Sequence, residues 1–411
     1  MSLKVFQKND DLNFIPGEIP YYSTLTKYLI LVGQHPQQSN LSRKTILTIL
    51  LISLISLLVP SFITITTSFR DKDMDAGLEC VPILVTILVS VIKIVNLNAN
   101  REQFRTIYEL VVEEWRSLRQ TDKIHVLDDI SGQGSKVAQL YRSTLITFLV
   151  FFALLPMMPL FLDVILPLNE TRLRQQVFRL EYLVNGDKYF YPIYFHSVWT
   201  SVTIVIIITT VDSFYMVLSH HACGLFAICG NEIKQATNST AENIHNIVEK
   251  RAMYQQLKKC IMSHKRAIHF YELIDDMNRN SFLLQLGMNM IGISVTSVQT
   301  FIYQTVMNLN RRAEAFRIGL FLVAQQFHLL FNSLPGQRLV DHSLQLAQNI
   351  YDSEWYRTPV RIQKLLIIMQ MRSGIPCTLT AGGLYDMNIQ NFGMIFKTCM
   401  SYFTMLMSLR E

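Results

Sequence analysis

Charged residues are scarce in this sequence of 411 residues. Only 17% of the chain is Asp, Glu, Lys or Arg, and 50% is hydrophobic, whereas soluble domains carry about a quarter charged residues. Several apolar stretches are longer than the ~20 residues that a helix needs to cross a bilayer. The shortage of charge therefore excludes an ordinary soluble protein and predicts an integral membrane protein.

Cysteine is also sparse, and the motifs of several enzyme classes are missing. The six cysteines are scattered without the paired spacings of a disulfide framework, so we expect free thiols. The chain has no Gly-rich phosphate loop, nucleophile elbow or H-E-x-x-H motif. We therefore predict no enzymatic activity, no catalytic residue and no cofactor.

One cluster contains the side chains that bind metals, namely His220, His221, Cys223 and Cys229. A zinc site needs four groups that converge on one point. Here residues 220 and 223 share a helix face, but no second pair joins them. We interpret these residues as structural and predict no metal site.

Seven apolar segments predict a bundle of seven packed transmembrane helices. Several contain Pro, Asn, Gln or His, which a helix in lipid tolerates only where its neighbours cover those groups. The predicted spans are residues 45–69, 78–98, 140–167, 189–219, 281–308, 314–334 and 388–409.

The distribution of Lys and Arg predicts the orientation of this all-α bundle. Most of the 37 basic residues lie in the N-terminal region and in the loops after the second, fourth and sixth spans. Because positive charge is retained on the cytoplasmic side during insertion, we expect the N-terminus inside and the C-terminus outside. The sequon at Asn169 then lies outside, where it could be glycosylated.

Two of the inner loops are patterned as amphipathic helices. Residues 102–119 and 241–280 place apolar side chains three and four positions apart. We expect these segments to extend the transmembrane helices into a packed cytoplasmic layer.

Charges inside the spans are costly and often functional. Lys93 lies five residues from the inner end of the second span, and we expect its ammonium group to snorkel to the interface. Asp212 lies deeper in the fourth span, where a buried hydrogen-bonded structural role is favoured over direct contact with a ligand.

The outer halves of the third and fourth spans combine aromatic, Met and Pro side chains with few polar groups. Such a lining suits a small apolar ligand, because burial supplies affinity and one or two hydrogen bonds set orientation. Ordinary helix packing or an interfacial aromatic belt would give the same composition, and both alternatives stay open. The candidate ligand residues here are Phe152, Pro156, Met157, Phe195 and Trp199.

The last span carries a narrow stripe of small polar groups. Lys397, Ser401, Met405 and Ser408 follow one another at steps of four, four and three, so they share one helix face. The stripe fits either close packing against another helix or the lining of a water path between subunits.

The C-terminal region carries a family resemblance. AQNIYDSEWYRTP, followed by KLLIIMQMRSGIPCTLTAGGLYDMNIQNFGMIFKTCMSYFTML, closely resembles the C-terminal signature of insect odorant receptors. HHACGLFAICG after the fourth span and the Pro-Gly-Gln at 335–337 are also similar to that family. The resemblance thus extends along the chain.

This resemblance implies a ligand-gated, non-selective cation channel that assembles as a heterotetramer with odorant receptor coreceptor subunits. The chain would be a tuning subunit in the plasma membrane of an olfactory neuron dendrite. Its partners would be membrane lipid, a small volatile odorant and permeating cations, and it would have no nucleic-acid partner. The gate falls on Met405, with Ser408 nearer the outer mouth and Ser401 on the same face. Further walls of the odorant pocket are Leu84, Tyr303, Phe316 and Leu320.

The implied division of the chain has three parts. Residues 1–334 form the six-helix bundle with the odorant pocket, 335–375 a cytoplasmic anchor, and 376–411 the pore-lining seventh helix. Two rival classes remain, a gustatory-receptor-like channel and a seven-helix receptor that signals through a G protein. The second needs the opposite orientation, and its usual acidic-Arg-Tyr and Asn-Pro-x-x-Tyr patterns are missing.

Overall fold

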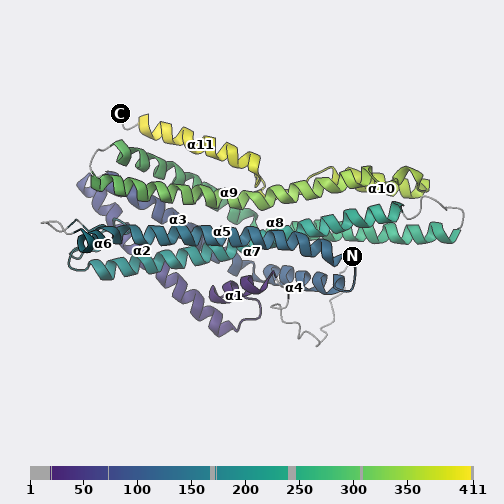
Figure 1. The fold of residues 1–411 in the computed structure, drawn as a ribbon, viewed down its shortest axis with the longest axis horizontal. Coiled ribbons are helices and arrows are strands. Elements are labelled where there is room, and N and C mark those ends of the chain that lie inside the picture. Colours follow the sequence, from purple (N-terminus) through teal and green to yellow (C-terminus); the bar gives the residue numbers. More distant parts are fainter. Residues whose placement is uncertain are drawn as a thin grey trace.

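The computed structural model describes residues 19, 21–72, 74–166, 172, 174–238, 247–305 and 309–408. Long helices dominate these residues and confirm the all-α prediction, and most of them run along the long axis of the molecule (Figure 1). The elements are α1 (Ser23–Leu31), α2 (Asn40–Asp71), α3 (Met74–Ala99), α4 (Arg101–Leu118), α5 (Ile124–Leu154), η2 (Leu155–Met157), α6 (Met158–Ile165), α7 (Phe190–Asn238), α8 (Ile247–Thr305), α9 (Leu309–Tyr351), η3 (Trp355–Arg357), α10 (Val360–Ser373), β1 (Thr380–Ala381), β2 (Tyr385–Asp386) and α11 (Ile389–Ser408).

Seven helical stretches occupy the positions of the seven predicted spans. Five of them are long and apolar enough to cross a membrane by length and composition, namely α2, α3, α5 with α6, α7 and α8. Helices α9 and α11 are long enough but less apolar, since polar residues such as Gln325 and Lys397 interrupt them. The predicted ends at Pro167, Asn308 and Leu409 lie outside the described residues.

Three helices are much longer than a bilayer is thick. Helix α7 has 49 residues and α8 has 59, so at 1.5 Å per residue α7 alone is roughly 70 Å long, against ~30 Å of hydrocarbon. Helix α9 also continues unbroken through Pro335 to Tyr351. The expected domain boundary at residue 334 therefore falls inside a continuous helix.

The third span is not one continuous helix. It begins as α5 at Ile124 and is interrupted by the 3-10 turn η2 before α6 continues to Ile165. Pro156 lies in η2, and Pro159 lies at the start of α6. Proline lacks a backbone N–H and clashes with the preceding helical turn, which accounts for the break at these positions.

The two segments that were predicted to be amphipathic helices are helical in the structure. Helix α4 matches the segment 102–119, and its apolar stripe, which includes Phe104, Ile107 and Trp115, is buried. Helix α8 runs through most of 241–280 without a break. Helices α4 and α10 and the first part of α8 gather at one end of the molecule, whereas the end of α11 lies at the other (Figure 1).

A short hairpin sets the position of α11. Strands β1 and β2 pair antiparallel, and Gly382 and Gly383 between them have φ of +66° and +69°, a backbone region that glycine adopts without strain. The hairpin is attached to α8, because the Thr380 N–H donates to Asp275 Oδ1 at 2.6 Å and the Gly382 N–H to the Arg279 carbonyl at 2.9 Å. The Asn388 side chain then caps α11 by accepting from the Asn391 N–H at 2.8 Å.

Candidate functional site

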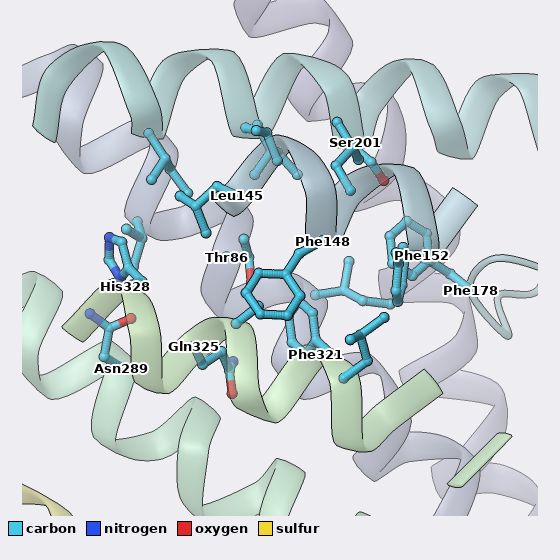
Figure 2. A pocket seen from close by; sticks show the side chains of 18 residues that line it. Thr86, Leu145, Phe148, Phe152, Phe178, Ser201, Asn289, Phe321, Gln325 and His328 are labelled. Carbon is cyan, nitrogen blue, oxygen red and sulfur yellow. The ribbon is translucent and has the colours of Figure 1, made fainter. Parts of the chain in front are cut away.

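An apolar cavity of about 130 Å³ lies inside the helix bundle. Helices α3, α5, α7, α8 and α9 form its walls, together with Phe178 from the segment between α6 and α7 (Figure 2). The lining residues are Ile83, Thr86, Val89, Leu145, Phe148, Leu149, Phe152, Phe178, Ser201, Ile204, Val205, Ile208, Asn289, Leu320, Phe321, Ala324, Gln325 and His328.

Helical spacing places these side chains on the inner faces of their helices. On α7, Ser201, Ile204 and Ile208 follow at steps of three and four, and Phe148 and Phe152 do the same on α5. The hydroxyls of Thr86 and Ser201 donate to carbonyls of their own helices, Pro82 at 2.7 Å and Ser197 at 2.8 Å. Each hydroxyl thus already donates its hydrogen bond within its own helix, and the wall that these residues form is mostly apolar.

A buried polar network bounds the cavity on its inner side. Asp212 of α7 accepts from Lys93 of α3, from the Tyr141 hydroxyl of α5 at 2.6 Å and from His328 Nε2 of α9 at 3.1 Å. His328 Nε2 also lies 3.1 Å from Asn332 Nδ2. The predicted buried, hydrogen-bonded role of Asp212 is confirmed.

The prediction that Lys93 snorkels was wrong. Its side chain is only 1% exposed and is paired with Asp212, which is also 1% exposed. The sequence alone could not predict an ion pair between two residues 119 positions apart, because this pairing depends on how α3 packs against α7. Once paired, neither charge has to reach the membrane surface, and four helices are connected by one network.

A second charged cluster bounds the cavity toward the end where α6 and the start of α9 lie. Glu79 accepts from the Tyr303 hydroxyl and lies 3.4 Å from Arg179. Arg317 donates to the backbone carbonyls of Gln176 and Val177. A small cavity of about 50 Å³ lies among these groups and shares Phe152 and Phe178 with the larger one. The apolar cavity thus lies between two polar layers.

The predicted ligand residues separate into those near the cavity and those far from it. Phe152 and Leu320 line it. Tyr303 is buried against Glu79 at its outer boundary. Three further candidates are buried or half-buried in the bundle but do not line the cavity, namely Leu84, Pro156 and Met157.

Three predicted ligand residues lie on the outer surface of the chain. Phe195, Trp199 and Phe316 are 66%, 60% and 62% exposed, and none of them lines the cavity. Trp199 is two positions from Ser201 and so lies on nearly the opposite face of α7. Large aromatic residues in this position are typical of a lipid-facing surface. These three residues therefore lie outside the candidate site.

Sequence reasoning also missed most of the cavity wall. Leu145, Phe148, Ile204 and Ile208 lie deeper in the bundle than the candidates that were chosen. The available signal was Ser201, a small polar residue that shares its helical face with Ile204, Val205 and Ile208. Phe178 lies outside the predicted spans and carried no periodic signal.

The polar stripe of α11 faces away from the rest of the chain. Ile395 and Cys399 are buried toward the bundle, and the Ser294 hydroxyl donates to the Cys399 carbonyl at 3.5 Å. Ser401, Met405 and Ser408 are exposed, and Met405 is 50% exposed. Packing within the chain therefore leaves this face uncovered.

Two further predictions from the sequence concern a metal site and a glycan. His220, His221, Cys223 and Cys229 are all buried, and His221 packs against the Phe270 ring. Throughout the described part of the chain, no three potential metal ligands come together. Asn169 lies outside the described residues.

The chain is similar to odorant receptors in sequence. A family model described as 7tm Odorant receptor matches residues 73–400. Odorant receptor 63a of Drosophila melanogaster is 20% identical over 200 residues, which cover 49% of this chain and 45% of that protein. Odorant receptor Or2 of Anopheles gambiae is 23% identical over 157 residues, which cover 38% and 39%. The chain spans about half the length, or less, of these curated relatives.

The fold is also similar to that of a solved receptor. The structure of the insect olfactory receptor OR5 from Machilis hrabei in complex with eugenol matches with a TM-score of 0.74. The match covers 95% of this chain and 98% of that one at 13% identity. The whole arrangement of helices is therefore shared.

Proposed function

Because the chain belongs to the 7tm odorant receptor family of insects, we propose that it is a subunit of an odorant-gated, non-selective cation channel. This family is a family of receptors rather than of enzymes. A small volatile binds in the cavity between α3, α5, α7, α8 and α9 and favours opening of a central pore. The pore is formed with odorant receptor coreceptor subunits in a heterotetramer in the plasma membrane of an olfactory neuron dendrite. The observation that carries the proposal is an apolar cavity inside the bundle together with an uncovered polar face on α11.

The cavity wall supports a neutral ligand. Four of its side chains are phenylalanines, and the centroid of the Phe152 ring lies 5.5 Å from that of Phe178 and 6.0 Å from that of Phe321. Asp212 lies beyond His328, and its carboxylate already accepts hydrogen bonds from three side chains. A charged ligand would lose its hydration without gaining a partner. Burial against aromatic and aliphatic groups supplies the affinity.

The uncovered face of α11 supports a pore made by several subunits. Ser401, Met405 and Ser408 would line the conduction path, and Met405 would form its narrowest point. In this assembly residues 335–375 act as the cytoplasmic anchor and residues 376–411 carry the pore helix. The Ser401 and Ser408 hydroxyls donate to carbonyls of their own helix. The face on which they lie is exposed in the single chain, so it can line a water path or meet another subunit.

Two contacts connect the bundle to α11 and support coupling between cavity and gate. The β1–β2 hairpin is tied to Asp275 on α8. On α9, the backbone at Gly336 lies directly against the Met387 carbonyl. An odorant that fits the cavity better when α8 and α9 are in the open arrangement biases the equilibrium by its difference in affinity for the two states.

The proposal is tested by recording currents from cells that express this chain together with a coreceptor. We expect odorants from a broad panel of small neutral volatiles to evoke cation currents that cells expressing the coreceptor alone do not give. Surface labelling of the tagged chain is measured in the same cells. If this chain and its coreceptor reach the surface together but give no odorant-evoked current across the panel, the result would contradict a channel function.

Replacing the cavity residue Phe152 with alanine is expected to change the ranking of odorants. Phe152 packs against Phe178 and Phe321 in the wall, so truncation removes contact area from ligands that reach it, and we expect half-maximal concentrations to shift by about tenfold. The matched control is Trp199→Ala on the exposed surface, for which we expect shifts within about twofold. Equal shifts for both variants would argue against this cavity.

Replacing Met405 with alanine is expected to widen the constriction. Current without odorant should rise, and ion selectivity or pore block should change, while the ranking of odorants stays as in the wild type. The measurement compares reversal potentials, block and spontaneous current at equal surface expression. A variant that changed only the ranking would place Met405 outside the pore.

A further inference from the structure

One polar side chain of the cavity differs from the others. The Oε1 atom of Gln325 is buried and has no hydrogen-bond partner among the described residues. By contrast, Thr86 and Ser201 donate to their own helices, and His328 Nε2 is engaged by Asp212. Gln325 therefore brings a buried acceptor without a partner to a mostly apolar wall, whose other amide side chain is that of Asn289.

Gln325 is one of the residues that line the cavity. It lies on α9 near Phe321 and Phe148 (Figure 2). Asn289 and His328 lie toward one end of the cavity, and Phe152 and Phe178 lie toward the other. A molecule in the cavity would touch the amide with one end and the phenylalanine rings with the rest of its surface. The wall therefore suits a ligand that has one polar end and an apolar body.

A buried acceptor without a partner is unfavourable, and a donor that fills the cavity removes that cost. Desolvating an amide without a compensating hydrogen bond is costly, most of all at membrane depth where no bulk water is present. A hydroxyl group is both donor and acceptor, so it can donate to Oε1 and accept from Nε2 of the same amide. An ether or a hydrocarbon cannot donate and leaves Oε1 unpaired.

The size of the cavity limits the ligand. A cavity of about 130 Å³ is close to the ~150 Å³ of an engineered apolar cavity that holds benzene. A six-membered ring with a short substituent, or an aliphatic chain of similar volume, is therefore of the right size. Two charged residues of opposite sign, Lys93 and Asp212, already pair behind His328, so this pair offers no free charge to an ionic ligand.

We propose that Gln325 hydrogen-bonds the hydroxyl group of a small neutral alcohol whose apolar body lies among Phe148, Phe152 and Phe321. The inference rests on the proposed odorant-binding function and adds to it the chemical class of the ligand. Gln325 is the specificity-determining residue, and it selects alcohols over hydrocarbons of the same shape.

The test uses two isosteric pairs, benzyl alcohol with ethylbenzene and 1-hexanol with heptane. In each pair a hydroxyl replaces a methyl group, so shape is nearly constant while the donor is removed. Currents and surface labelling are measured for the full chain with its coreceptor. We expect half-maximal concentrations for at least one alcohol to be roughly tenfold or more below those of its hydrocarbon partner.

The variant is Gln325→Leu, which keeps the length of the side chain and removes the amide. We expect it to abolish or reverse the preference for the alcohol. The matched control is Gln326→Leu, one position along the helix, where the side chain lines a different groove beside α11 and its Oε1 is likewise buried without a partner among the described residues. This control should keep the wild-type preference, because it removes the same group from the same helix outside the cavity.

Binding of the same four compounds to the purified complex, followed by saturation-transfer NMR, separates this inference from the proposed function. Alcohol binding that depends on Gln325 without any evoked current would uphold the inference and contradict channel gating. Currents with equal alcohol preference in the wild type and Gln325→Leu would uphold gating and overturn the inference. Failure of both alcohols to bind would overturn it as well.

Discussion

Asp212→Asn is expected to prevent most of the receptor from reaching the cell surface in a folded state. The change keeps the size of the side chain and removes only its charge, which leaves the Lys93 ammonium group buried without a counterion. Removing one partner of a buried ion pair costs about 3–5 kcal/mol. That is a large share of the ~5–15 kcal/mol by which a typical domain is stable. The measurement is surface biotinylation together with thermal unfolding in detergent.

Two controls separate the loss of a buried charge from the loss of any charge. Glu109→Gln removes the exposed partner of Arg105, where both side chains are 60% exposed, and such pairs contribute less than about 1 kcal/mol. The double variant Lys93→Met with Asp212→Asn removes both buried charges and should recover much of the surface expression. If Asp212→Asn behaved like Glu109→Gln, the network would not hold the helices together.

Gly336→Ala is expected to reduce odorant-evoked current per surface receptor by tenfold or more. A Cβ at this position would overlap the Met387 carbonyl, which is backbone and cannot rotate away. Helix α9 and the segment that leads into α11 must then separate, at a cost of about 1–3 kcal/mol for overpacking. The measurement is evoked current divided by surface label.

Gly287→Ala is the matched control for this prediction. Gly287 also lies within a long helix, α8, but a Cβ there meets nothing within 4 Å. Alanine stabilises a helix by up to about 1 kcal/mol relative to glycine, so this variant should express and respond like the wild type. If Gly336→Ala kept normal evoked currents, the contact at Met387 would not couple α9 to α11.

The sequence was informative where polar and apolar residues alternate with a helical period. Helix α4 was predicted because its apolar stripe lies against charged neighbours, and Asn388, the first residue of the seventh predicted span, caps α11 in the structure. In both places water on one side imposes the pattern. These elements stand at or beyond the membrane boundary, where that contrast exists.

The cavity could not be located in this way, because lipid is as apolar as the protein interior. Phe148 lines the cavity and Phe195 lies on the outer surface, yet both are phenylalanines within apolar segments. Nothing in the composition of α5 or α7 says which face is turned inward. The pairing of Lys93 with Asp212 was missed for a related reason, since it depends on the rotation of α3 relative to α7.

The cavity wall and the polar face of α11 share no residue. Every residue that lines the cavity precedes the β1–β2 hairpin in the sequence, whereas Ser401, Met405 and Ser408 follow it. Substitutions that accumulate on α5, α7 or α9 can therefore alter which molecules fit without changing α11. The fold thus separates the residues that we propose to contact the odorant from the face of α11 that we propose to meet other subunits, so the cavity can be altered one residue at a time without a change on that face.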